Sequence, residues 1–319
     1  MVRSRPERIY EADILPEQKY ILDNELEWSD YRNIMFFDIE TWYDADHPDG
    51  NMPDAAALPI TAIVGYSTLD QRYFVFSWQP EKTKDYKEPK MVDADNVSYS
   101  FFANEESMLT AFMDFVRLSH VDILTGWYSS QYDLPYIINR AKNLALNYKA
   151  LSPINELKMY KKGDYWRIYL QGLDHIDMQD ALQDLGYNLP NWKLATAAQE
   201  ILKDPDVEKL KASTWQNWLD DYKGFLEYAV RDVEILVEIE KKVRIFDLYN
   251  SLQAQAGLVT MSLVMSKSVV VDSYIKTAFN NKIVFPTRVT QEKQKYMGAI
   301  VLDPKEPGVH KDMCILDYT

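Results

Sequence analysis

The feature that most constrains the fold is a short, unbroken apolar run, Ile34-Met35-Phe36-Phe37, followed at once by two acids. A strand with one face in water alternates apolar and polar side chains, whereas this run has no polar side chain on either face. It therefore predicts a strand buried on both faces. Such a strand is typical of a sheet covered by helices, so we expect an α/β fold.

The segments around this strand predict a mixed sheet with flanking helices. Residues 60–67 and 72–78 are β-rich and predict a hairpin, and residues 104–119 have the apolar spacing of a helix. A short strand over 121–125 and a helix over 134–146 follow. Further along, we expect a hairpin with a Gly-Asp turn over 156–173, helices over 194–202, 215–219 and 223–246, mostly helical structure over 247–283, and a short strand over 314–316.

Charge and composition exclude some classes of protein. The chain has 319 residues and a net charge of −14, which argues against a basic protein that coats duplex DNA. Surplus carboxylates suit a cation-dependent site for phosphate substrates, or they simply keep the protein soluble. The single cysteine, Cys314, excludes an intrachain disulfide and a four-thiolate metal site. With no long apolar run, we expect a soluble intracellular protein.

Asp38 and Glu40 lie directly after the apolar run. Side chains two residues apart in a strand point the same way, so both carboxylates face one side of the sheet. Two close carboxylates repel each other unless a cation or a proton lies between them. The pair indicates either a metal site or an ordinary solvated strand end.

The helix expected over 223–246 carries a carboxylate on its apolar face. Asp232 lines up with Ile235 and Leu236, away from the charged stripe of the helix. A carboxylate that faces the core is costly unless it is paired or bound to a metal. Tyr228, one turn earlier, can reach the same place. Asp232 is therefore either a metal ligand or an acid neutralised by a buried arginine.

Asp133 lies in a third polar segment, just before a helix with Pro135 in its first turn. On local evidence alone, Asp133 is expected to be the N-cap of that helix.

Taken together and in this order, these segments resemble the three exonuclease motifs of the family B DNA polymerases. The first motif, Asp-x-Glu, and the third, Tyr-x-x-x-Asp, match fully, and the second matches at its Tyr-Asp end. It departs at its first position, where the family usually has an asparagine near the bound strand and this chain has Tyr128. The matching residues are Asp38, Glu40, Tyr132, Asp133, Tyr228 and Asp232.

The resemblance extends along nearly the whole chain, with phage and archaeal members the most similar. Residues 10–14 and 20–23 resemble the segment that precedes the exonuclease domain, and the 156–173 hairpin resembles one that helps to separate primer from template. Tyr296-Met297-Gly298-Ala299 is similar to a template-binding motif between the two domains. Residues 314–319 resemble the start of polymerase motif A, with Asp317 as its metal-binding aspartate.

The resemblance implies a ribonuclease H-like exonuclease domain with a mixed sheet flanked by helices. We expect a remnant of an N-terminal domain at 1–33, the exonuclease domain at 34–246, a helical linker at 247–285 and an incomplete palm start at 286–319. The rest of motif A, the fingers lysine and the second catalytic aspartate are absent from the sequence. We therefore expect no polymerisation by this chain alone, with the palm supplied by another chain or removed in a truncated form.

The resemblance also implies a mechanism, in which two Mg²⁺ or Mn²⁺ ions support hydrolysis of single-stranded 3′ ends. Hard cations prefer oxygen ligands, which fits an all-carboxylate site. Asp38, Glu40 and Asp232 would hold the ion that activates water, with Asp38 bridging to a second ion beside Asp133. Tyr228 would orient the water. The expected DNA contacts are Tyr132, Lys161, Lys162, Tyr296 and Gly298.

Two other hypotheses about function are also consistent with the sequence. The chain is a free-standing exonuclease acting on RNA or DNA, or it is a non-catalytic scaffold that binds template strand or completes a palm in trans. The expected partners are single-stranded 3′ ends or primer-template DNA, a palm fragment and a sliding clamp, with no membrane. The expected location is the cytoplasm, which for a viral protein is that of the host.

Overall fold

The structure is a computed structural model that describes residues 10–24, 26, 32–44, 46, 48–80, 91–94, 96–203, 216–280, 282–287 and 308–309. The chain divides into two units, one of residues 1–13 and 284–319 and the other of residues 14–283. In the first unit, Tyr10 and Pro286 form an antiparallel bridge, and the backbone N–H of Glu11 donates to the carbonyl of Phe285 at 3.1 Å.

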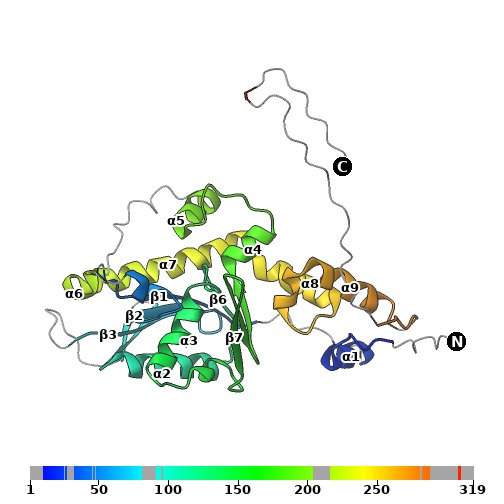
Figure 1. The fold of residues 1–319 in the computed structure, drawn as a ribbon, viewed down its shortest axis with the longest axis horizontal. Coiled ribbons are helices and arrows are strands. Elements are labelled where there is room, and N and C mark those ends of the chain that lie inside the picture. Colours follow the sequence, from blue (N-terminus) through cyan, green and yellow to red (C-terminus); the bar gives the residue numbers. More distant parts are fainter. Residues whose placement is uncertain are drawn as a thin grey trace. The chain divides into compact units, whose positions relative to one another are not determined.

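Seven strands within the described residues of the second unit form one mixed sheet, in the order β4-β5-β3-β2-β1-β6-β9 (Figure 1). The pairs β1–β2, β2–β3 and β4–β5 are antiparallel, and β1–β6, β6–β9 and β3–β5 are parallel. The mixed sheet expected from the sequence is confirmed. The strands are β1 (Ile34–Thr41), β2 (Ile60–Ser67), β3 (Arg72–Trp78), β4 (Met91–Ala94), β5 (Val97–Phe102), β6 (Ile123–Gly126) and β9 (Asp174–Asp177).

The strand β1 lies inside the sheet, paired with β2 on one side and β6 on the other. Its side chains alternate between two hydrophobic cores. Met35 and Phe37 pack into one core, and Phe36 packs into the other. The apolar run is therefore buried on both faces, as predicted.

Helices cover both faces of this sheet (Figure 1). The helices α2 (Glu105–Leu118) and α3 (Asp133–Asn143) pack with the core that contains Phe37, and α7 (Tyr222–Val243) packs with the core that contains Phe36. The helix α7 contacts both β1 and β2 directly. Within the described residues, no helix has both the length and the apolar character needed to cross a membrane.

A separate hairpin of β7 (Leu157–Lys162) and β8 (Tyr165–Leu170) confirms the hairpin predicted over 156–173. Gly163 sits in its turn with φ +65°, a conformation that glycine adopts without steric cost. The remaining elements are α1 (Pro16–Asp23), η1 (Pro48–Asn51), η2 (Tyr148–Leu151), α4 (Met178–Asp184), α5 (Leu194–Ala197), η3 (Ala198–Leu202), α6 (Asn217–Asp220), α8 (Ile245–Ala256), η5 (Met261–Met265) and α9 (Lys267–Ala278).

The structure differs from the sequence predictions in several places. The strands β4, β5 and β9 and the helices α1 and α4 were not predicted. The long helix predicted to Phe246 ends at Val243, because Arg244 adopts a left-handed conformation with φ +59° and the carboxylate of Glu240 accepts the N–H groups of Ile245 and Phe246. The N-cap position of α3 is Tyr132, so the N-cap role predicted for Asp133 is wrong.

Candidate active site

Two carboxylates of the candidate site come from the end of β1. Asp38 and Glu40 alternate along β1 with Phe37 and Ile39, which pack into the core shared with α2 and α3. They therefore lie on the same face of the sheet as Phe36, the face that α7 covers. The regular alternation of a strand is sufficient to place both acids on one side.

The helix α7 supplies the third carboxylate. Asp232 lies one turn after Tyr228, and the Tyr228 hydroxyl donates a hydrogen bond to the Asp232 carboxylate. Neighbouring Arg231 directs its guanidinium to Glu234 at 3.1 Å and Glu238 at 3.2 Å. The tyrosine hydroxyl thus points at the same place as the buried acid, as the one-turn spacing predicts.

The two elements bring Asp38, Glu40 and Asp232 together. One carboxylate oxygen from each lies within 4.8 Å of the other two, and all three side chains are partly buried. Hard divalent cations prefer such oxygen ligands. Among the described residues, these three acids form the cluster that could hold a cation.

The proton affinities of the cluster show that its negative charges are poorly compensated by the protein. Burial, and then the charges of Asp133, Glu40 and Asp232, raise the pKa of Asp38 well above its usual range. Burial and the charges of Asp232 and Asp133 raise the pKa of Glu40 to about 8. Burial raises the pKa of Asp232 to about 6, against the hydrogen bond from Tyr228. A bound cation would favour the charged forms of all three, so the donor set fits a divalent metal.

Asp133 reaches the site from the first residue of α3. Its side chain is 3% exposed, and its Oδ1 accepts the backbone N–H of Ile39, between Asp38 and Glu40, at 3.2 Å. Burial raises the pKa of Asp133 to about 7. The fourth predicted acid therefore lies against the same strand, although it is outside the three-acid cluster.

Tyr132 lies beside this strand as well. Its hydroxyl is 3.1 Å from the Thr41 hydroxyl, and its ring centroid is 5.6 Å from that of Tyr136. Burial raises the pKa of the Tyr132 hydroxyl. The residue predicted to contact terminal bases is thus half-buried next to the end of β1.

The loop before α3 holds the residue at which the second motif departs. Tyr128 has φ +56° and is 45% exposed. A left-handed backbone is unusual for a bulky residue, and asparagine adopts it more readily. The conformation of the loop is therefore one that suits the asparagine of the motif, and Tyr128 adopts it nevertheless.

The two lysines predicted to touch DNA have different surroundings. The Lys161 ammonium lies 2.6 Å from the Asp54 carboxylate and 4.9 Å from the ring centroid of Trp166. Lys162 is exposed and pairs across the hairpin with Tyr165. The other predicted contacts, Tyr296 and Gly298, and the predicted metal ligand Asp317 lie outside the described residues.

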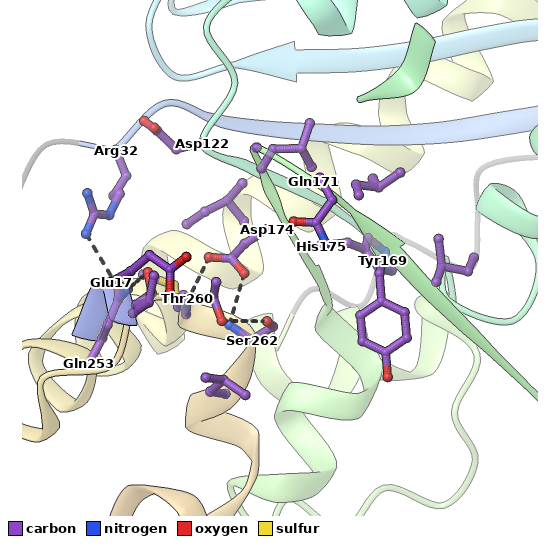
Figure 2. Close-up of a pocket in the computed structure, with 18 of the residues that line it drawn as sticks. Glu17, Arg32, Asp122, Tyr169, Gln171, Asp174, His175, Gln253, Thr260 and Ser262 are labelled. Atoms are coloured by element: carbon purple, nitrogen blue, oxygen red, sulfur yellow. Dashed lines mark hydrogen bonds between the residues drawn. The ribbon is translucent and has the colours of Figure 1, made fainter. Parts of the chain in front are cut away.

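Two carboxylates on β9 were not predicted to have a role. Asp177, at its end, accepts backbone N–H groups from the loop that contains Tyr128. Asp174, at its start, accepts N–H groups at the beginning of η5 and lines a cavity of about 800 Å³ at that end of the strand (Figure 2). Local sequence carries no signal for either contact, because the partners are 47 to 88 residues away along the chain.

Comparison with known proteins agrees with this geometry. Residues 10–197 match the family model for the exonuclease domain of DNA polymerase family B. The chain is 29% identical to the DNA-directed DNA polymerase of Enterobacteria phage T4 over 79% of its length, and 26% identical to that of Escherichia phage RB69 over 89%. It is 24% identical to the DNA polymerase of Thermococcus aggregans over 97% of its length.

The chain spans only part of each of these relatives. The matched region is 31% of the T4 protein, 33% of the RB69 protein and 16% of the Thermococcus protein. The similarity therefore concerns the N-terminal portion of much longer proteins.

Proposed function

Because the chain belongs to the family B DNA polymerases and carries their exonuclease domain, we propose that its acidic cluster hydrolyses single-stranded DNA from the 3′ end. The family prediction is confirmed, and the class of enzyme that we propose is an exonuclease that is part of a DNA polymerase. The observation that carries the proposal is the convergence of Asp38, Glu40 and Asp232 within 4.8 Å. Mg²⁺ or Mn²⁺ is the proposed ion.

The residues of the cluster divide the work in the proposed mechanism. Asp38, Glu40 and Asp232 would hold the divalent cations, with Asp133 on the opposite side of Asp38. When bound, the cations would stabilise negative charge that develops on the phosphate. The Tyr228 hydroxyl, fixed by its hydrogen bond to Asp232, would orient the attacking water. Tyr132 would stack near the terminal base.

The exposed face of the β7–β8 hairpin has side chains that suit the binding of a single DNA strand. Lys158 pairs with Tyr169, Tyr160 with Arg167, and Lys162 with Tyr165, so cations alternate with aromatic rings. All six side chains are exposed, in a chain whose net charge is −14. Aromatic rings stack on bases and cations neutralise phosphates, so this face suits a single strand. Lys162 belongs to the face, whereas Lys161 is engaged by Asp54.

The decisive experiment uses the purified chain and a 5′-labelled single-stranded oligonucleotide. With Mg²⁺ we expect a ladder that shortens from the 3′ end and disappears with EDTA. The Asp38→Ala/Glu40→Ala variant should be inactive, and Glu227→Gln, an exposed acid of α7, should be unchanged. Persistence of the ladder in the double variant would overturn the assignment of the cluster, and its absence in the wild-type chain would overturn the nuclease.

Several expectations extend beyond this domain. We propose that template-directed synthesis requires palm residues in addition to those of this sequence, with Asp317 contributing a metal ligand and Tyr296 and Gly298 contacting the template. We also propose domain boundaries at residues 33, 246 and 285. We expect a palm fragment and a sliding clamp as partners, and a cytoplasmic location.

A further inference from the structure

We propose that Asp177 is a positioning residue that holds the loop Trp127–Tyr132 in shape and thereby places Asp133 against β1. The inference rests on the proposed nuclease function and adds to it a residue outside the acidic cluster. Asp177 ends β9 and is 3% exposed. None of the steps proposed above uses this buried carboxylate.

The Asp177 carboxylate accepts three backbone N–H groups. Its Oδ1 accepts from Gln179 at 3.0 Å, which caps α4, and also from Tyr128 at 3.0 Å. Its Oδ2 accepts from Ser130 at 2.9 Å. A helix cap needs only the first of these bonds. The other two bind a loop that is 47 to 49 residues away along the chain.

The loop requires such support because of its backbone conformation. Tyr128 has φ +56°, which is sterically unfavourable for a residue with a Cβ atom. The two bonds from Asp177 fix the N–H groups of residues 128 and 130, on either side of the peptide that follows Tyr128. The Tyr128 carbonyl then accepts the N–H groups of Gln131 at 3.1 Å and Tyr132 at 3.0 Å, which closes the turn.

The turn leads directly to Asp133. The Leu134 N–H donates to the Ser129 carbonyl at 3.0 Å, so the first turn of α3 is built on this loop. Asp133 then accepts the Ile39 N–H of β1. The strand β6, which leads into the loop, ends close to both β1 and the loop, since a Cβ atom at Gly126 would lie 2.7 Å from the Phe37 carbonyl oxygen and 3.0 Å from the Ser129 Cβ atom. A displaced loop would therefore displace Asp133 from the strand that carries Asp38 and Glu40.

The same strand offers a matched control. Asp174, at the other end of β9, accepts the N–H groups of Met261 at 2.7 Å and Ser262 at 3.3 Å (Figure 2). It has the same chemistry as Asp177 but anchors η5, at the opposite end of β9 from Asp177. Loss of Asp174 tests the general cost of removing a carboxylate that caps backbone.

The test compares Asp177→Ser with Asp174→Ser. Serine keeps the cap of α4 but is too short to hold the loop. We expect Asp177→Ser to lower kcat for 3′-end cleavage by about tenfold or more with KM nearly unchanged, because small displacements of a catalytic group are costly. In calorimetric titration it should also bind Mn²⁺ more weakly. Asp174→Ser should match the wild-type chain in both measurements.

Two further variants distinguish a loss of loop support from a general loss of folding. If Asp177→Ser fails to fold by circular dichroism, Asp177→Asn replaces it, since the amide keeps the shape but turns an NH₂ group toward an N–H group. In a Tyr128→Gly chain, whose glycine has no left-handed penalty, the loss caused by Asp177→Ser should shrink. A loss of the same size there, or equal effects of the Asp177 and Asp174 substitutions, would overturn the inference. An inactive wild-type chain would instead overturn the nuclease itself.

Discussion

Replacement of Glu40 by glutamine should stabilise the metal-free protein at pH 8 while abolishing its nuclease activity. Burial and the charges of Asp232 and Asp133 raise the pKa of Glu40 from 4.5 to about 8. One pKa unit corresponds to about 1.4 kcal/mol, so near pH 8 the folded state loses up to about 4 kcal/mol relative to a neutral side chain. Because neighbouring acids redistribute their protons, we expect a gain of about 2–4 kcal/mol in the free energy of unfolding of Glu40→Gln.

The sign of the pH dependence follows from the raised pKa. Between pH 4.5 and about 8, Glu40 binds more protons in the folded chain than in the unfolded chain, so stability falls as the pH rises. The advantage of Glu40→Gln should therefore be small at pH 5 and large at pH 8. Added Mg²⁺ should stabilise the wild-type chain at pH 8 and reduce or reverse the difference, because the ion binds the charged cluster of the folded state.

Urea unfolding of both chains at pH 5 and pH 8, with EDTA or with Mg²⁺, measures these differences. Glu227→Gln is the control, since Glu227 is exposed and pairs with Lys223 on the surface of α7, where such a pair contributes at most about 1 kcal/mol. A gain for Glu40→Gln that is the same at both pH values, or no gain at pH 8, would refute the argument that the cluster is held together against its own repulsion.

Three other predictions concern packing and protonation. Arg140→Ala should lower the free energy of unfolding by about 3–5 kcal/mol in urea titration, because it leaves the buried Glu105 carboxylate, 2.7 Å from the guanidinium, without its cation. Gly65→Ala should unfold at a much lower temperature or fail to fold, since its Cβ atom would lie 2.4 Å from the Phe36 carbonyl oxygen; a melting temperature like that of the wild-type chain would contradict the tight packing of β1 on β2. Tyr228→Phe removes a hydrogen bond that lowers the pKa of Asp232, so the acidic limb of the pH–rate profile should move to higher pH, and an unmoved limb would argue against that bond.

The sequence was sufficient to predict the parts of the site that depend on local periodicity. The apolar run at residues 34–37 predicted a doubly buried strand, and the two-residue repeat put Asp38 and Glu40 on one face of it. The helical repeat put Asp232 and Tyr228 on the same side of α7. These patterns depend on backbone geometry within a few residues, so they can be recognised from the sequence alone.

Other features had weak or misleading local signals. The strand β5 has only half-buried side chains, and β9 has only four residues, and neither was predicted. Asp133 has the residue type of a helix cap, but it is the first residue of α3, and its carboxylate accepts the N–H group of Ile39 in β1. The preference of aspartate for a helix N-cap was overridden here by a tertiary contact, because an N–H group near the end of a strand gives the buried carboxylate a hydrogen-bond partner.

The periodicity of the chain was thus enough to predict which acids share a face, and its ordered motifs were enough to predict the family. The three-dimensional fold was needed to show that three of the acids meet within 4.8 Å, that Asp133 contacts the same strand, and that Asp177 binds the loop before α3. The physical reason is that strand order and side-chain contact depend on burial shared by segments far apart in the chain. Periodicity fixes the direction of a side chain, whereas packing fixes its neighbours.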